Sequence, residues 1–263
     1  MALDAILDSI PDFSDWKKAE HWLAQGLSQN FTQYGGASKA GASVEWLEWR
    51  DIAGECSASE GSSEARGDSR ALGNGGNSPN GLFGFYSFIQ WRKFVLACFL
   101  ADLISYPAAP EVNDQVDFPR LAFIMNACPE RFRIGFLKLK DGHYWPFGYT
   151  ATYPISESQF RLLEKTPDQL KDRFIPPEAG GRSTHPFLFL FNYSVAPVFR
   201  SSPYSRAIME RFVHDLDTIQ YQGLACITVS EDGARVARRF GMTCSGHVGE
   251  LHERVFVKRN LCE

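Results

Sequence analysis

An arginine and a group of serines follow an apolar, aromatic segment in the second half of the chain. Residues 187–195, FLFLFNYSV, have the composition of a buried strand, and Pro197 ends that strand. Ser202 and Pro203 have the residue types of a helix start, because serine caps the first turn and proline lacks only a donor that would be unpaired there. Arg200 lies in the connecting loop. A helix N-terminus that follows a strand, with an arginine beside it, is typical of a phosphate or pyrophosphate site.

The same segment resembles a known family motif. Its spacing, Val195-x-Pro197-x-x-Arg200-x-x-Pro203-x-Ser205, is similar to the V-x-P-x-x-[RQ]-x-x-G-x-[GA] motif of the GNAT N-acetyltransferases. Pro203 stands where that family has glycine, and Ser205 where it has glycine or alanine. The chain therefore resembles a divergent member of the family.

This resemblance covers roughly residues 121–259 and implies both a fold and an activity. The implied fold is α/β, a mixed and mainly antiparallel sheet with helices on both faces, in which the strands 187–195 and 224–229 splay apart to hold acyl-CoA. The implied activity is an acyltransferase reaction. It moves an acyl group from acetyl-CoA, a longer acyl-CoA or another acyl-thioester to an amine on a small molecule or a protein. A non-catalytic acyl-CoA-binding or regulatory protein of the same fold is the alternative.

Seven residues are implied to hold the co-substrate. The backbone at Val195 would bond the pantetheine arm, and Arg200 would lie beside the pyrophosphate. The phosphate cradle would be formed by Ser201, Ser202, Pro203, Tyr204 and Ser205. Pro203 removes one backbone donor from this cradle and Ser205 adds a Cβ, while the serine hydroxyls would compensate in part. A well-capped helix without a ligand is the other interpretation of the same residues.

The resemblance also indicates where an acid for the leaving thiolate would lie. The family often carries tyrosine there, on the helix after the fifth strand, and this chain has Ala237. Ser230, at the start of that helix, is the first substitute, although a serine in that place also serves as an ordinary helix cap. Tyr193 is the second. Catalysis is possible without an acid, because holding an amine beside a thioester supplies a large share of the rate enhancement.

Candidates for a general base are the side chains expected to face the cleft. They are Tyr193, Asn192, His185 and His143. A loose group of possible metal ligands near the end of the chain lacks the spacing of a zinc signature. This group is Cys244, His247 and His252. We expect no metal.

Composition sets the limits of the interpretation. The chain has 263 residues, 44% hydrophobic content and a net charge of −4, so we expect a sizeable core and no nucleic-acid partner. Its six cysteines are scattered without a CxxC pair, which favours free thiols and a cytoplasmic protein. Residues 53–81 are rich in serine and glycine and predict a flexible insertion. We divide the chain into a helical N-terminal region, 1–120, and an acyltransferase domain, 121–263.

The remaining elements follow from periodicity and turn signals. Residues 4–30 predict two helices, and residues 44–52 are compatible with helix or strand. Residues 82–105 predict one long buried helix rather than a membrane span, because Gln90, Arg92 and Lys93 lie near its middle. We further expect a strand at 121–125, a hairpin of 133–140 with 144–155 around Asp141-Gly142, and helices that begin at 156 and at 166–167. A strand at 253–259 closes the chain.

Overall fold

A seven-stranded sheet forms the centre of the molecule in the computed structural model, which describes residues 43–49, 88–105, 118–138, 142, 144–170, 173–178, 186–250 and 253–260. The strand order is β1-β2-β3-β4-β5-β7-β6. The strands are β1 (Ser43–Glu48), β2 (Phe132–Lys138), β3 (Tyr144–Ile155), β4 (Phe187–Val195), β5 (Gly223–Thr228), β6 (Thr243–Val248) and β7 (Glu253–Arg259). All neighbours are antiparallel except β4 and β5, which are parallel.

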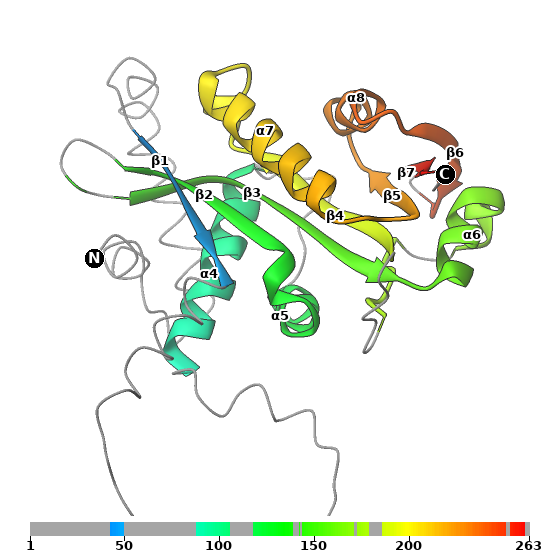
Figure 1. The fold of residues 1–263 in the computed structure, drawn as a ribbon, viewed down its shortest axis with the longest axis horizontal. Helices are drawn as coiled ribbons and strands as arrows, with labels where there is room; N and C mark the ends of the chain where they lie inside the picture. Colours follow the sequence, from blue (N-terminus) through cyan, green and yellow to red (C-terminus); the bar gives the residue numbers. More distant parts are fainter. Residues whose placement is uncertain are drawn as a thin grey trace, which may run out of the picture.

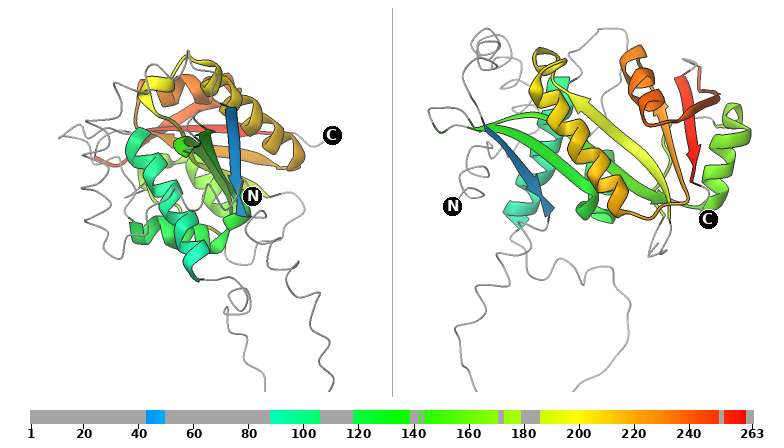
Figure 2. Two further views of the ribbon diagram at one scale, coloured as in Figure 1. Left: turned by 90° about the vertical axis from the view of Figure 1, so that its left-hand side faces the viewer. Right: turned by 45° about the horizontal axis from the view of Figure 1, so that its top comes forward.

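Helices cover both faces of this sheet (Figure 1). They are α4 (Phe88–Ser105), α5 (Phe118–Ala127), α6 (Glu157–Lys165), α7 (Pro203–Thr218) and α8 (Glu231–Arg239). Figure 2 shows α7 and α8 on one face and α4 and α5 on the other, while α6 lies at the end of the sheet that holds β6 and β7. The predicted fold class, a mixed and mainly antiparallel sheet with helices on both faces, is confirmed.

Two apolar clusters hold these layers together. The larger cluster joins α4 and α5 to the faces of β2, β3 and β4, and its largest buried side chains are aromatic. A smaller one fills the space under α7 and α8, where Leu188, Phe212, Leu224 and Phe256 meet. Gly148 of β3 lies where a Cβ would come within 2.3 Å of the Ser194 carbonyl oxygen, so glycine is needed for the close packing at this point.

One predicted strand is wrong. Residues 121–125 lie inside α5, where Leu121, Ile124 and Met125 are buried and Phe123 is 56% exposed. Burial at positions i, i+3 and i+4 is the spacing of residues on one face of an α-helix. A short apolar run such as LAFIM does not distinguish a strand from a helix by periodicity alone, and this explains the error.

Most other element boundaries agree with the sequence. Of the two alternatives at residues 44–52, helix or strand, the strand is present as β1, at residues 43–48. Helix α4 ends at Ser105, ahead of the proline at 107. Ser156 caps α6 in a capping box with Gln159. The second helix expected at 166–167 is only a single 3₁₀ turn, Pro167–Gln169. The helices expected within 4–30 and the insertion at 53–81 lie outside the described residues.

Elements on both sides of residue 120 share one sheet and one core. β1 pairs with β2, and α4 packs on β3 and β4. Any division of the chain near residue 120 must therefore keep β1 and α4 with the sheet. The division into regions 1–120 and 121–263 stays a prediction. Within the described residues, no helix is both long and apolar enough to cross a membrane.

Candidate active site at the splayed strands

The two parallel strands at the centre of the sheet diverge after a short contact. β4 and β5 pair only through Phe187↔Gly223, Leu188↔Leu224 and Phe189↔Ala225. Beyond these pairs β4 continues against β3, and β5 continues against β7. The splay predicted between 187–195 and 224–229 is therefore present, and it opens toward the start of α7.

The backbone of β4 faces this opening at its C-terminal end. The Ala196 N–H donates to the Phe147 carbonyl on β3 at 2.8 Å. Successive residues of a strand direct their peptide groups to opposite edges. The N–H and C=O of Val195 therefore face the side from which β5 has turned away. The Val195 oxygen accepts a hydrogen bond from Arg200 Nε at 3.2 Å.

A tight turn leads from β4 into α7. Ser202 N–H donates to the Phe199 oxygen, and Ser201 has φ 60, so the turn has the geometry of type II. Ser201 is exposed and occupies the position at which glycine is favoured. The turn places its peptide groups and the first turn of α7 at the open end of the splay.

The serine hydroxyls at this turn already have local hydrogen bonds. Ser202 Oγ accepts from the Tyr204 N–H at 3.2 Å and donates to the Phe199 oxygen. Ser205 Oγ donates to the Ser202 oxygen at 2.8 Å. Tyr204 is buried against Phe199. The structure thus brings the five predicted cradle residues together, with the hydroxyls of Ser202 and Ser205 engaged in shaping the turn.

Arg200 connects three elements around the splay. Besides Val195, its guanidinium donates to the Ser105 oxygen at the end of α4 at 3.0 Å and to Asp232 in the first turn of α8 at 3.3 Å. A carbonyl at a helix C-terminus and a carboxylate are both favourable partners for a cation. Arg200 is therefore a positioning residue, and its contact with a pyrophosphate stays a prediction.

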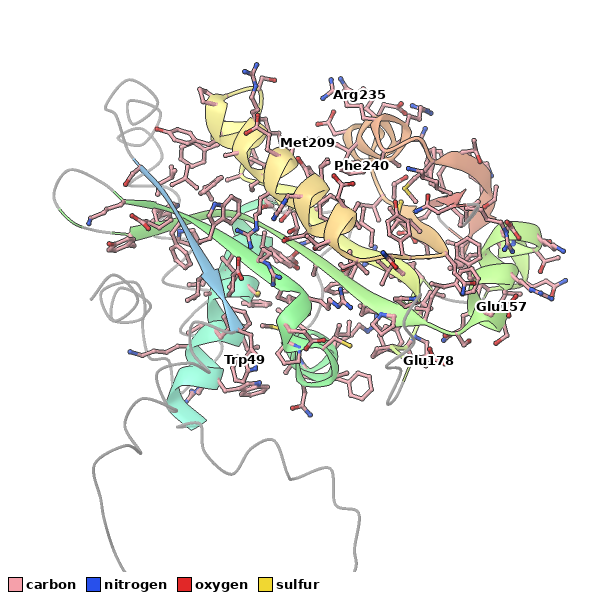
Figure 3. The ribbon with its side chains drawn as sticks, in the orientation of Figure 1. Trp49, Glu157, Glu178, Met209, Arg235 and Phe240 are labelled. Carbon is pink, nitrogen blue, oxygen red and sulfur yellow. The ribbon has the colours of Figure 1, made fainter. Side chains whose placement is uncertain are left out.

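Aromatic side chains fill the α7/α8 face of the splay. The Tyr193 ring packs against Phe212 of α7 at 5.8 Å and against Phe240 at 5.9 Å, and the Phe212 and Phe240 rings are 5.0 Å apart. Phe240 lies at the end of α8 (Figure 3). Burial raises the pKa of Tyr193 to about 12. The phenol is therefore neutral at physiological pH and is able to donate a proton.

The two positions considered on α8 have ordinary structural surroundings. Ser230 is exposed and caps α8, its Oγ accepting from the Gly233 N–H at 3.1 Å. Ala237 is 1% exposed within the apolar cluster under the helix. A tyrosine side chain would find no room at this position, so Ala237→Tyr is not expected to supply the missing acid.

The opposite face of the splay carries a polar group that the motif did not indicate. Asp102 of α4 is 1% exposed, and its Oδ1 accepts from the Tyr149 hydroxyl and from Asn192 Nδ2, each at 3.1 Å. A bulge in the β3–β4 register, between Ala151 and Thr152, allows this arrangement. It leaves an extra residue in β4, so that Phe191 and Asn192 both contact side chains of the α4 face.

A small cavity adjoins this carboxylate. Its volume is about 90 Å³. Its lining comes from α4, α5, β3, β4, the segment before β4, and the end of β5 with the residue after it: Asp102, Arg120, Tyr153, Arg173, Phe174, Phe189, Phe191, Asn192, Ile227 and Val229. Since β4 and β5 both contribute, the cavity lies on the α4 side of the splay. Sequence reasoning considered Asn192 but not Asp102, although an aspartate within the apolar run of residues 94–104 is itself a signal.

A second cavity, of about 280 Å³, lies on the α7 face of β2 and β3. Glu48 of β1 is nearly buried there and contacts Arg133 at 3.3 Å and Arg211 of α7. Asp215 contacts the same two guanidiniums at 3.2 and 3.3 Å. These four charged residues link β1, β2 and α7.

The histidine candidates are not brought to the splay by the described structure. His143, His185 and His252 lie outside the described residues. His247 is exposed on β6 together with Cys244. Among the residues that the structure describes, no group of three or more His, Cys, Asp or Glu side chains is arranged to hold a metal ion.

Comparisons with known proteins give solved structures of similar fold. No protein-family model and no curated protein sequence matches the chain. The loading GNATL domain of CurA from Lyngbya majuscula is 11% identical with a TM-score of 0.45, over 63% of this chain and 92% of that one. Ard1 from Thermoplasma volcanium is 10% identical with a TM-score of 0.39, over 59% and 88%.

A third structure, the GphF GNAT-like decarboxylase in complex with isobutyryl-CoA, is 12% identical with a TM-score of 0.43, over 63% and 94%. Two of the three are named GNAT, the family that the motif from Val195 to Ser205 resembles. At these low identities and TM-scores, the function of this chain has to be argued from its own residues.

Proposed function

We propose that this protein is an acyltransferase that moves an acyl group from an acyl-thioester, most simply acyl-CoA, to an amine. The observation that carries the proposal is the divergence of β4 from β5 after three residue pairs. Parallel neighbours in a sheet normally remain bonded along their length, because an unpaired strand edge leaves donors and acceptors without partners. An extended amide-bearing chain such as pantetheine is able to accept from the Val195 N–H, while the Val195 oxygen already accepts from Arg200 Nε.

Some features of this site fit such a co-substrate, and others do not. The peptide groups of Val195 face the opening, and their bonding does not depend on side-chain identity. The first turn of α7 offers a helix N-terminus for phosphate. However, Pro203 has no N–H and the Tyr204 N–H is bonded to Ser202, so fewer donors remain than in a glycine-rich loop. We therefore expect binding dominated by the pantetheine and acyl portions.

The reaction needs the amine nitrogen to form a bond to the thioester carbon while the C–S bond breaks. Holding both reactants in the splay supplies much of the rate enhancement. The departing thiolate then takes a proton. In this proposal Tyr193 is the preferred donor, because its ring lies on the α7/α8 face of the splay and its phenol is neutral. Ser230 is the second candidate.

A charge placed at the start of α7 tests the co-substrate site. Ser205→Asp puts a carboxylate in the first turn of the helix, where it favours the helix dipole but repels a phosphate. Calorimetry should show CoA affinity falling by roughly tenfold or more, about 1.4 kcal/mol, without loss of thermal stability. Ser158→Asp in the first turn of α6 introduces the same charge at a distant, exposed position and should leave the affinity unchanged.

Turnover is measured separately, as thiol release from acetyl-CoA and longer acyl-CoAs in the presence of small amines. Arg200→Ala is a less specific probe, because its loss also removes the bonds to Ser105, Val195 and Asp232. Equal CoA affinity in wild type and Ser205→Asp, or no affinity in either protein, would reject the site.

A further inference from the structure

An ion pair joins the ends of the two diverging strands. Arg200 lies just after β4, and its partner Asp232 lies in the first turn of α8, the helix that follows β5. Because β4 and β5 are parallel, their C-terminal ends lie at the same edge of the sheet. The contact between Arg200 Nη1 and Asp232 Oδ2, at 3.3 Å, therefore bridges the open end of the splay.

The same guanidinium also occupies two backbone acceptors at this end. Its Nε donates to the Val195 oxygen at 3.2 Å, and its Nη2 donates to the Ser105 oxygen at 3.0 Å. An extended chain that pairs fully with the edge of β4 uses both the N–H and the C=O of Val195. Arg200 thus holds an acceptor that such a chain needs, and full pairing at Val195 requires the guanidinium to move.

Asp232 is able to release Arg200 and still keep a cationic partner. Its Oδ1 accepts from Arg235 one turn further along α8, whereas its Oδ2 accepts from Arg200. The side chains of Arg200 and Asp232 are 44% and 53% exposed. An ion pair between groups this exposed changes an equilibrium by no more than about fivefold, so a ligand is able to break it.

We propose that the Arg200–Asp232 pair is a latch that closes the splay before the acyl donor binds, and that a donor with a pyrophosphate opens it by exchange. The guanidinium leaves Asp232 and bonds phosphate oxygens, while Asp232 stays paired with Arg235. An uncharged thioester has to break the same ion pair and gives no anion in return. Asp232 is therefore a specificity-determining residue.

This inference rests on the proposed acyl transfer and names its donor, an acyl-CoA rather than an uncharged thioester. Pantetheine has no charged group, so it tests the latch without the repulsion between Asp232 and phosphates. In calorimetry on the full chain, Asp232→Asn should tighten the binding of both pantetheine and CoA by about two- to fivefold, the range of an exposed ion pair.

Glu231→Gln is the matched control for the lost charge. It removes a carboxylate from the same turn of α8, but that carboxylate pairs with Arg238 and Arg254. Pantetheine binding should be unchanged in this variant. In an Arg200→Met background, Asp232→Asn should also leave pantetheine binding unchanged, because the latch has already lost its cation.

Salt gives a second measurement of the latch. At about 1 M NaCl the Debye length falls to about 3 Å, and exposed ion pairs are screened. Pantetheine should then bind the wild type more tightly relative to Asp232→Asn than at low salt, so that the two affinities converge. Affinities that differ by the same factor at both salt concentrations would contradict an ion-pair latch.

The exchange with phosphate predicts a different pattern for ligand preference. The wild type should bind CoA more tightly than pantetheine, and Asp232→Asn should keep this preference. Arg200→Met should reduce it by about tenfold or more, the loss expected for a charged hydrogen bond. Equal binding of CoA and pantetheine by the wild type would overturn the exchange.

The outcomes separate this inference from the proposed function. Equal pantetheine affinity in wild type and Asp232→Asn, with CoA bound by both, would overturn the latch and leave acyl transfer standing. Tighter binding by Asp232→Asn, in a protein that releases no thiol from any acyl-CoA with amines present, would support the latch and reject acyl transfer. No binding of CoA or pantetheine by any of these proteins would overturn both.

Discussion

Two carboxylates are buried on opposite faces of the same sheet, and they are compensated in different ways. Glu48, on the α7 face, contacts the guanidiniums of Arg133 and Arg211, which Asp215 also contacts. Asp102, on the α4 face, accepts from a phenol and an amide. The first arrangement balances charge with charge. The second includes two neutral donors, a phenol and an amide, on one oxygen of the carboxylate.

This difference indicates why the α4 face is the better candidate for chemistry. A charge that is paired with two guanidiniums contributes to the packing of β1 against α7, and a proton transfer to Glu48 would break these ion pairs. Asp102 instead lies beside the cavity that β4 and β5 both line, and its Oδ1 accepts from two neutral groups. The α7 face is further filled by Tyr193, Phe212 and Phe240.

The largest expected effect comes from breaking the charge network. Glu48→Gln leaves Arg133 and Arg211 with one carboxylate between them in a nearly buried site, and removal of one partner from such a site costs about 3–5 kcal/mol. Urea unfolding should show this loss with an unchanged m-value. The double variant with Arg211→Met should recover part of it. A loss below about 1 kcal/mol would show that Glu48 is not structural.

A pH-dependent effect of about 2–3 kcal/mol is expected at Tyr193. Burial raises its pKa from 10.0 to about 12, so the folded state keeps a proton that the unfolded state has lost. The contribution of Tyr193 to the free energy of unfolding is fully present below pH 10. It is lost as the pH rises toward 12, and it amounts to about 1.4 kcal/mol for each unit by which the folded-state pKa exceeds the unfolded-state pKa.

Tyr193→Phe isolates this contribution. The buried thiols of Cys128 and Cys226, with pKa values also raised to about 12, act in the same direction but are present in both proteins. Unfolding free energies measured from pH 9 to 12 should therefore converge or cross between wild type and variant. Parallel curves would mean that the phenol is not buried as described.

An aromatic side chain under α8 should destabilise the α7/α8 face. Ala237→Tyr places a phenol among packed apolar groups, and overpacking of this kind costs about 1–3 kcal/mol. Arg235→Tyr, on the exposed side of the same helix, should change stability by less than about 0.5 kcal/mol. If Ala237→Tyr were neutral and accelerated acyl transfer, the packing assigned to this face would be wrong.

The elements around the splay were largely predictable, because the sequence signals for their starts and ends are local. The apolar run 187–195, the proline at 197 and the cap at Ser202 each have one dominant interpretation, and the structure has the elements that they predict. The error at 121–125 arose where a five-residue apolar run had no such signal. Burial of Leu121 and Ile124 against α4 and the sheet decided the matter there.

The second buried acid could not be located from spacing. Asp102, Tyr149 and Asn192 are up to 90 residues apart and meet only because a bulge in β4 turns Asn192 toward α4. Arg200 shows the reverse case. Its place in the motif was evident, but its bonds to Ser105 and Asp232 depend on where α4 and α8 end. Long-range contacts of this kind are set by packing of whole elements and leave no mark on local periodicity.

The smallest expected effect on stability gives the sharpest test of the comparison. Asp102→Asn keeps an oxygen that is able to accept from Tyr149 and Asn192, so these hydrogen bonds lose their charge assistance but keep their acceptor. Because the folded protein no longer has to desolvate a charge, that loss is largely offset, and we expect a net change of about 1 kcal/mol or less. Urea unfolding under the conditions used for Glu48→Gln measures it. A loss as large as that of Glu48→Gln would mean that both carboxylates are structural. A small loss would mean that the charge of Asp102 contributes little to the stability of the fold, in contrast to the charge of Glu48.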